Sequence, residues 1–350
     1  MFDIANLRRA TDDEIRHWHE LIATNPAGGD VLQTQAFAAV KAQYGWRPEF
    51  WVYETSFGPV YALFLTKNIP RVGRVIYVPR GPSVNNIKEW REICRLNRKH
   101  LHATLVRMEP PILKTAVRIL PNNLVKVDNI QKHLSSTVIL NLNQDETSLL
   151  ASFRQRARRS IRGGKREKLR VVNAGFSAQS VNQMWRLYKE TARRASLRIR
   201  PKSYYRRFWR RFCEQDLGRF FFVMAPGESA PIAGAFVCII GSYALYKDGG
   251  SRRDVDAHFS HLLHWRIMQW LRARNVTRYD LDGTPPSDRL HDTTHRLYSI
   301  GIFKTSFGAP VVDYVGAYDQ ILHYQDYKRW LRVEKISQTI LNHTPRRGLY

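Results

Sequence analysis

One pattern that occurs twice along the chain constrains the fold most strongly. Three consecutive strand-like segments joined by short turns are followed by a helical segment and then by one more strand. The first occurrence comprises 49–55, 58–69, 72–84, a helix after Asn86 and 102–111. The second comprises 219–225, 231–240, 243–250, a helix at 257–274 and a strand at 278–283. Short connections favour an antiparallel meander, and in each half a helix–strand pair follows it. We therefore predict an α+β (mixed α/β) protein, and the repeat is compatible with an ancient duplication.

The length of 350 residues suggests two domains of ordinary size. A strand is predicted at 136–142, after which Asn143 or Asp145 caps a long helix whose apolar residues are Leu149, Leu150, Phe153 and Ile161. We place the domain boundary near 143–147. A late strand at 311–319 and a closing helix at 320–341 complete the predicted elements.

Net charge is the unusual compositional feature. The sequence has 56 Lys and Arg against 30 Asp and Glu, a formal net charge of +26. An excess of this size indicates a polyanionic partner, such as nucleic acid, a phosphate-rich ligand or an anionic membrane face.

The positive charge is concentrated in two clusters, between Arg154 and Arg170 and between Arg193 and Arg211. The first contains nine cations and one acid, Glu167, and the second is interleaved with aromatic residues. Like charges at helical spacing repel each other, and a bound anion offsets that cost. Motifs that read bases are absent, so the clusters favour contact with a phosphate backbone.

Several other classes of protein are disfavoured. The charged N-terminus does not resemble a secretory signal peptide, and the longest apolar stretch, 231–246, is too short for a membrane span. Three scattered cysteines favour reduced thiols in a cytoplasmic protein. The motifs of P-loop, Rossmann, serine-hydrolase and zinc-protease sites are absent. The paired histidines at 291 and 295, and those at 258, 261 and 264, favour ordinary positions over metal ligation, so we expect no metal.

An ordered set of short motifs covers nearly the whole chain. Its members are Leu32-Gln33, Gly81-Pro82, Arg107-Met-Glu109-Pro110, the basic helix near 154–162, Tyr279-Asp-Leu-Asp-Gly283, Phe303-Lys304-x-x-Phe307-Gly308 and Gly316-x-Tyr318-Asp319. In this order they resemble the Fem family of aminoacyl-tRNA-dependent peptidyltransferases, which build the interpeptide bridge of peptidoglycan.

The resemblance implies two GNAT-like domains with a substrate cleft between them. The first would comprise 1–144 plus 318–350, closed by the C-terminal helix, and the second 145–317. It further implies an aminoacyl-tRNA donor, a nucleotide-linked or lipid-linked muropeptide precursor as acceptor, and no cofactor. The chain would be a cytoplasmic monomer, with a peripheral contact to an anionic membrane left open. Two departures from the family are the missing coiled-coil insertion and Asp282, which stands where an aromatic residue or Gly is common.

The resemblance also assigns residues. Lys304, with Phe303 beside it, matches the lysine expected near the tetrahedral intermediate, and Glu109 matches an acidic residue near the acceptor. Lys41 and Arg200 match basic residues that meet the precursor's phosphates. Further candidates are Gln33, Tyr77 and Arg80 for the precursor and Arg154, Arg158, Arg159, Arg162, Arg206, Arg207 and Arg210 for tRNA. Without the resemblance, Lys304 reads as a surface lysine and Glu109 as a strand-end carboxylate in a surface turn.

Two other functions stay open. A GNAT-type N-acyltransferase would use acyl-CoA, but residues 251–256, before the helix at 257, contain no glycine of the usual pyrophosphate loop. A non-catalytic RNA-binding protein would explain the charge but not the ordered motifs.

Overall fold

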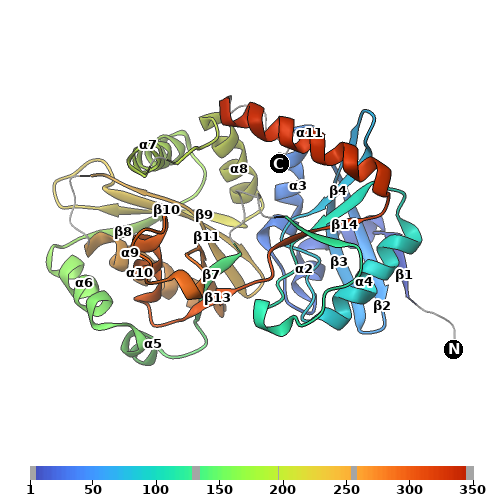
Figure 1. The fold of residues 1–350 in the computed structure, drawn as a ribbon. Coiled ribbons are helices and arrows are strands. Elements are labelled where there is room, and N and C mark those ends of the chain that lie inside the picture. The colour runs from blue at the N-terminus through green and yellow to red at the C-terminus, as the bar shows by residue number, and fades with distance from the viewer. Residues whose placement is uncertain (1–4, 128–134, 196, 254–257, 344–350) are drawn as a thin grey trace. The chain divides into compact units, whose positions relative to one another are not determined.

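The computed structural model describes residues 5–343 except 128–134, 196 and 254–257. The chain divides into two compact units, Met1–Ser135 with Asp313–Tyr350, and Ser136–Val312. Figure 1 shows the elements of each unit. No helix among the described residues combines the length and the apolar character that a bilayer crossing requires.

The first unit is built on a seven-stranded sheet with the order β1-β2-β3-β4-β5-β14-β6. Its strands are β1 (Asn6–Arg9), β2 (Arg47–Thr55), β3 (Gly58–Ile69), β4 (Gly73–Val78), β5 (Leu105–Met108), β6 (Leu124–Val127) and β14 (Ala317–Ile321). Its helices are α1 (Asp12–Arg16), α2 (Trp18–Ala23), α3 (Gln35–Ala42), α4 (Ile87–His100) and α11 (Tyr324–His343), with short 3₁₀ turns η1 (Val31–Gln33) and η2 (Lys114–Ala116).

Alternation along β3 gives this sheet two buried faces. Val60, Ala62 and Phe64 belong to a core that includes Trp90 and Ile93 of α4. The intervening Tyr61 meets Trp18 of α2 edge to face, with 5.9 Å between the ring centroids. Residues that alternate along a strand point to opposite faces, so helices cover both sides of the sheet.

The second unit also has a seven-stranded sheet, with the order β13-β7-β12-β11-β10-β9-β8. Its strands are β7 (Ser136–Asn141), β8 (Arg170–Ala174), β9 (Gly218–Met224), β10 (Ala233–Ile240), β11 (Tyr243–Ser251), β12 (Arg278–Gly283) and β13 (Val311–Asp313). Its helices are α5 (Glu146–Ser152), α6 (Gln155–Arg166), α7 (Ala178–Arg194), α8 (Lys202–Glu214), α9 (His258–Arg272) and α10 (Tyr298–Thr305), with a 3₁₀ turn η3 (Ser287–Arg289).

The two sheets repeat one topology, in which the predicted meanders each have one further strand at the start, β1 and β8, that the sequence analysis did not predict. Each has three consecutive antiparallel pairings, β1 to β4 in the first unit and β8 to β11 in the second. Each then has one parallel pair, β4 with β5 across α4 and β11 with β12 across α9. The duplication is therefore visible in the order and direction of the strands.

Three predicted bounds differ from the structure. The strand at 136–142 pairs with β12, so it belongs to the second sheet and not to the first domain. The late strand at 311–319 is two strands: β13 joins the second sheet and β14 the first. The long helix capped by Asp145 is interrupted at Phe153 and Arg154, which are extended, so α5 and α6 are separate helices.

A buried ion cluster fixes the C-terminal segment to the first sheet. The guanidinium of Arg107 on β5 contacts both oxygens of Asp319 on β14, at 2.6 and 2.7 Å, and also Glu334 on α11. Arg107 and Asp319 are fully buried, and Glu334 is nearly so. A cation in this environment is stabilised only while its carboxylates remain beside it.

We predict that Arg107→Met destabilises the first unit by about 3–5 kcal/mol, because it leaves two buried carboxylates without a counter-ion. Chemical denaturation measures the loss. The triple variant in which Met replaces Arg107 and Leu replaces Asp319 and Glu334 should recover most of it, since no buried charge remains. A loss below about 1 kcal/mol for Arg107→Met would contradict the prediction.

Candidate functional site

In the first unit, predicted site residues meet where the parallel strands β4 and β5 end. Tyr77, on β4, donates its hydroxyl hydrogen to Glu109, with 3.0 Å between the oxygens. The backbone N–H of Arg80 donates to the other carboxylate oxygen at 3.0 Å. Parallel strands have their carboxyl ends at one edge of the sheet, which explains why residues 32 positions apart converge here.

Glu109 is a buried carboxyl group and does not lie in a surface turn. Only 8% of the residue is exposed. Burial raises the pKa of Glu109 above its ordinary value, although the contacts from Arg80 and Tyr77 act in the opposite direction. A buried carboxyl group with a raised pKa next to defined hydrogen-bond donors is a candidate for proton transfer.

Gln33 holds the turn after β4 in place. Its amide oxygen accepts from the backbone N–H of Leu63 at 2.6 Å, and its amide nitrogen donates to the carbonyl of Pro79. Both ends of the amide are thus engaged by backbone. The structure gives Gln33 the role of positioning the segment that carries Arg80.

Lys41 is a buried cation in the same part of the first unit. Its ammonium lies 5.8 Å from the ring centroid of Trp46, and the ammonium of Lys67 lies 4.4 Å from the same centroid. The Trp46 ring in turn lies 6.1 Å from that of Tyr77. The sequence analysis missed Trp46 and Lys67, which carry no motif.

In the second unit, the parallel strands β11 and β12 separate at their carboxyl ends. Their pairing stops at Leu245 and Asp280. Beyond that point Asp248 pairs with β10 and Gly283 pairs with β7. A register shift in β10 leaves Lys247 as the extra residue of a β-bulge. Bulges of this kind redirect a side chain and are common beside functional sites.

Lys304, in the last turn of α10, reaches the end of β12. Its ammonium donates to the carbonyl oxygens of Asp282 at 3.0 Å and Gly283 at 2.6 Å. Only 7% of the residue is exposed, so the interpretation as a surface lysine is wrong. An ammonium has three N–H donors, and these two contacts leave one for another acceptor.

Acidic groups surround this lysine. Burial lowers the pKa of Lys304 to about 8, while Asp282 and Asp280 raise it in part. The backbone of Asp282 has φ 60°, which Asp tolerates better than most residues and which explains why Gly can occupy the position. Its N–H donates to the carboxylate of Asp280 at 2.7 Å, so the two residues form one turn.

The structure adds residues that the sequence analysis did not identify. Asp280 also accepts from the hydroxyl of Tyr243 at 2.7 Å. Lys247 lies 3.7 Å from Asp248, and although burial alone would lower its pKa, Asp248 and Asp282 hold that pKa above the ordinary value. The adjacent charges Lys247 and Asp248 within an apolar strand were the signal that could have identified them.

The Phe-Lys-x-x-Phe-Gly motif also has a structural role. Phe307 packs edge to face on Phe153, with 5.2 Å between centroids, and the N–H of Arg154 donates to the carbonyl of Ser306 at 2.9 Å. Gly308 has φ 88°, and a Cβ there would lie 2.2 Å from the carbonyl oxygen of Ser152. The motif therefore produces the interruption between α5 and α6. Phe303 packs on His261 and His264 at 4.9 and 5.5 Å.

The histidines of α9 belong to this packing. His261 lies 3.0 Å from the hydroxyl of Ser306, and His264 lies 3.0 Å from that of Tyr279. Burial lowers the pKa of His261 to about 4 and that of His264 to about 3. Within the described ranges, no group of three or more His, Cys, Asp or Glu side chains could hold a metal ion.

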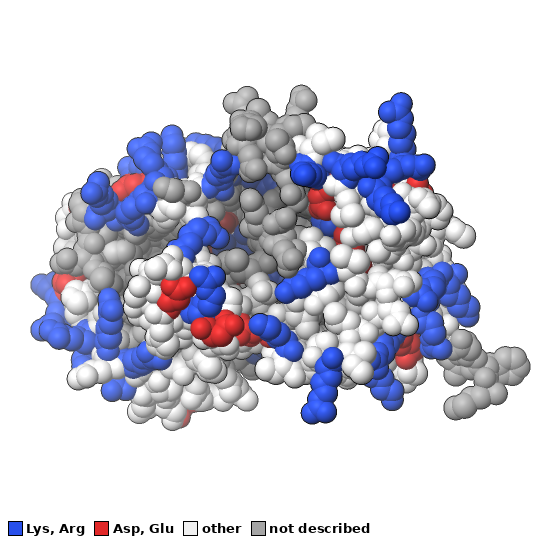
Figure 2. Space-filling view, viewed as in Figure 1, with Lys and Arg blue, Asp and Glu red and all other residues white. Residues whose placement is uncertain are grey.

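Except for Arg154, which is extended and precedes α6, the predicted tRNA contacts lie on α6 and α8, on opposite sides of the second sheet, with α6 packed on α9. Buried residues of α6 share a core with Phe221 of β9, whereas Trp209 of α8 packs on Phe220 at 5.4 Å. Arg159 and Arg162 of α6 are exposed, as are the arginines of α8. In Figure 2, Lys and Arg side chains gather where α6 lies and over α7.

Individual arginines differ in their contacts. Arg158 donates to the carbonyls of Ala151 and Phe153, both at 2.8 Å, and so caps α5. Arg210 forms an ion pair with Glu214 at 2.6 Å. Arg200 precedes α8, and its guanidinium lies 4.5 Å from the ring centroid of Tyr204. The approach of Lys41 to Arg200 and the cleft between the domains stay predictions.

The lowered pKa of Lys304 predicts a specific pH dependence of stability. From about pH 8 to the ordinary value of 10.5, the folded chain has lost this proton while the unfolded chain keeps it. The unfolded state then binds more protons, so stability rises with pH. Relative to Lys304→Met, the free energy of unfolding of the wild type should rise by about 1.4 kcal/mol per pH unit in this window. Denaturation curves at several pH values test it, and a constant difference between the two proteins would refute it.

Comparisons with known proteins identify the fold. The acetyltransferase (GNAT) domain family matches residues 151–288, which is less than half of the chain. A search of curated proteins by sequence found no match.

Solved structures cover nearly the whole chain. The crystal structure of FemX has a TM-score of 0.76 and 17% identity, over 92% of this chain and 99% of FemX. A conserved protein of unknown function from Bacteroides thetaiotaomicron has a TM-score of 0.54 and 10% identity, over 91% of this chain and 100% of that one. These likenesses concern the fold. The predicted α+β fold of two GNAT-like units, as in FemX, is therefore confirmed.

Proposed function

We propose that the protein is an aminoacyltransferase that moves an amino acid from aminoacyl-tRNA to the amine of a peptidoglycan precursor stem peptide. The observation that carries the proposal is the buried ammonium of Lys304, fixed by two carbonyl oxygens with one N–H remaining. The FemX-like fold supports a transferase of the acyl-transfer type.

The chemistry requires few groups from the protein. An aminoacyl ester is already activated, so the acceptor amine can attack its carbonyl without a covalent enzyme intermediate. The new C–N bond forms, the C–O bond to the tRNA ribose breaks, the amine loses a proton and the ribose oxygen gains one. The carbonyl oxygen carries negative charge only near the tetrahedral intermediate, where a fixed ammonium stabilises it.

Glu109 and Lys41 suit the acceptor side. The carboxylate form of a group whose pKa is raised by burial can take the proton that the amine nitrogen loses as it adds to the ester carbonyl. Lys41 and Lys67 both lie beside Trp46. We propose that these two cations bind phosphates of the precursor. Arg200 is proposed as a second phosphate contact.

For the tRNA, we propose α6 as the main contact. Its exposed Arg159, Arg162 and Arg166 face solvent, whereas Glu214 on α8 pairs with Arg210 and Arg211. Because α6, packed on α9, and α8 lie on opposite sides of one sheet, a single straight segment of RNA does not reach both. The reaction is proposed to occur in the cytoplasm, where charged tRNA is present, and the enzyme to act as a monomer.

An acyl-CoA-dependent N-acyltransferase is the second candidate, because the GNAT family match covers 151–288. The predicted absence of a glycine loop concerns 251–256, of which residues 254–256 lie outside the described residues. The sequence there has no glycine to present backbone N–H groups to a pyrophosphate.

We predict salt-dependent tRNA binding through α6. Log affinity should fall linearly with log salt concentration, because phosphate contacts release counter-ions. Replacing Arg159, Arg162 and Arg166 by Gln should reduce the slope by up to about 3. The matched variant of Arg206, Arg207 and Arg210 on α8 should change it less. Filter binding across a salt series measures both, and an unchanged slope for the α6 variant would refute the assignment.

We predict that Lys304→Met lowers kcat by about 10²–10³ and changes either KM much less, because the oxyanion exists only near the transition state. Transfer kinetics with charged tRNA measure the effect. Lys304→Arg should rescue little, since a planar guanidinium does not place its charge where an ammonium does. Thermal unfolding of Lys304→Met controls for folding, and near-normal turnover by the folded variant would exclude this role.

A further inference from the structure

The exposed face of α4, in the first unit, carries more basic than acidic residues. Its members are Lys88, Arg91, Arg95, Arg98 and Lys99. Two carboxylates lie on the same helix and accept hydrogen bonds from neutral groups, so they reduce the positive charge of this face without cancelling it. Glu89 accepts from the backbone of Asn85 and the side chain of Asn86, and Glu92 accepts from Ser56. Cations one and two turns apart on a helix repel one another unless an anion lies over them.

A second segment lies against this helix and adds apolar surface. Residues 113–122 contain Lys114 and Arg118 and no acid. The guanidinium of Arg91 donates to the carbonyl of Ile119 at 3.0 Å, which holds the segment on α4. Ile119 is nevertheless 71% exposed and Leu113 46% exposed. Aliphatic side chains in such positions gain free energy only when an apolar phase removes them from water.

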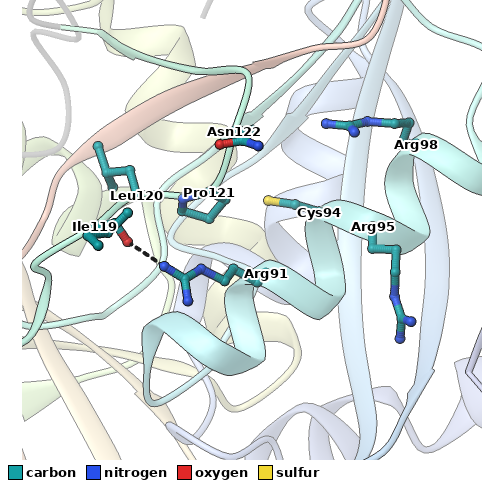
Figure 3. Close-up of a pocket in the computed structure, with 8 residues that line it drawn as sticks. All are labelled: Arg91, Cys94, Arg95, Arg98, Ile119, Leu120, Pro121 and Asn122. Carbon is teal, nitrogen blue, oxygen red and sulfur yellow. Dashed lines mark hydrogen bonds between the residues drawn. The ribbon is translucent and has the colours of Figure 1, made fainter.

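Between the helix and the segment lies an open pocket of about 410 Å³. Figure 3 shows Arg91 and Arg98 extending from α4 toward the segment, while Arg95 extends away from it. Leu120, Pro121 and the thiol of Cys94 supply an apolar wall. Burial raises the pKa of Cys94 to about 12, although Arg98 acts against this, so the thiol is neutral and leaves the pocket cationic.

We propose that this surface, the exposed face of α4 together with residues 113–122, binds an anionic lipid bilayer, with a headgroup phosphate in the pocket. The cations match the charge of the headgroups, and Ile119 enters the acyl boundary. RNA is the rival occupant. Exposed aliphatic residues favour lipid, because RNA-binding surfaces use exposed aromatic rings for stacking.

The proposal does not depend on the transfer reaction, so its test needs neither donor nor acceptor. The full chain is sedimented with vesicles of phosphatidylcholine, with and without phosphatidylglycerol. We expect binding only when phosphatidylglycerol is present. A basic residue near an anionic surface contributes about 1 kcal/mol, or roughly fivefold, so replacing Arg91, Arg95 and Arg98 by Gln should lower the partition coefficient by about 10².

Replacing Arg159, Arg162 and Arg166 by Gln removes the same charge from α6 and is the matched control. This variant should keep vesicle binding, and the α4 variant should keep tRNA binding. Ile119→Ser should lower vesicle binding severalfold without changing tRNA binding. Three results would overturn the proposal. They are equal partitioning of the wild type to both kinds of vesicle, equal losses of vesicle binding in the two triple variants, and an α4 variant that loses tRNA binding but keeps vesicle binding. The proposal would also be overturned if inorganic phosphate displaced the protein from phosphatidylglycerol vesicles as strongly as an excess of such vesicles does.

Discussion

Parallel pairing of two strands across a crossover helix is the constraint on which both candidate sites depend. Each sheet has one central pair of this kind, β4 with β5 and β11 with β12. The carboxyl ends of parallel strands lie at one edge, so polar residues that follow them meet without being neighbours in sequence. In the first unit this brings Glu109 to Tyr77. In the second, the strands separate beyond Leu245 and Asp280, and Lys304 reaches the end of β12.

Two buried cations, Arg107 and Lys304, are stabilised differently. Arg107 has two carboxylates in direct contact, so its charge is neutralised where it lies. Lys304 has carbonyl oxygens as direct partners, and burial lowers its pKa to about 8. A lysine in that environment lowers the stability of the fold, which is consistent with the catalytic role proposed for it. Its ammonium stays charged near neutral pH and keeps one donor for a substrate oxygen.

Local pattern was sufficient for most of the fold. Alternating apolar residues and short turns predicted both meanders, and Asn86 was correctly expected to precede α4. The predictions were wrong where tertiary contacts override local preference. Phe153 is held by Phe307, and Arg154 donates to Ser306, so a helical pattern is interrupted by residues about 150 positions away. Likewise, the 311–319 segment has continuous strand character, but its two parts pair with different sheets. The motifs selected Lys304 and Glu109, whose roles stay proposals. For Lys247 the adjacent Asp248 was the available signal, whereas Trp46 and Lys67 depend on spatial neighbours and carry no motif.

The measurement that tests the central claim most directly is a transfer assay that supplies the wild-type chain with two donors in parallel. One series contains charged tRNA and the other acyl-CoA, each with a panel of nucleotide-linked and lipid-linked muropeptide precursors. The account predicts an amide product, detected by mass spectrometry, only with charged tRNA, and no CoA binding by calorimetry. Product formation from acyl-CoA with none from charged tRNA would contradict it and assign the GNAT-like fold to N-acyl transfer.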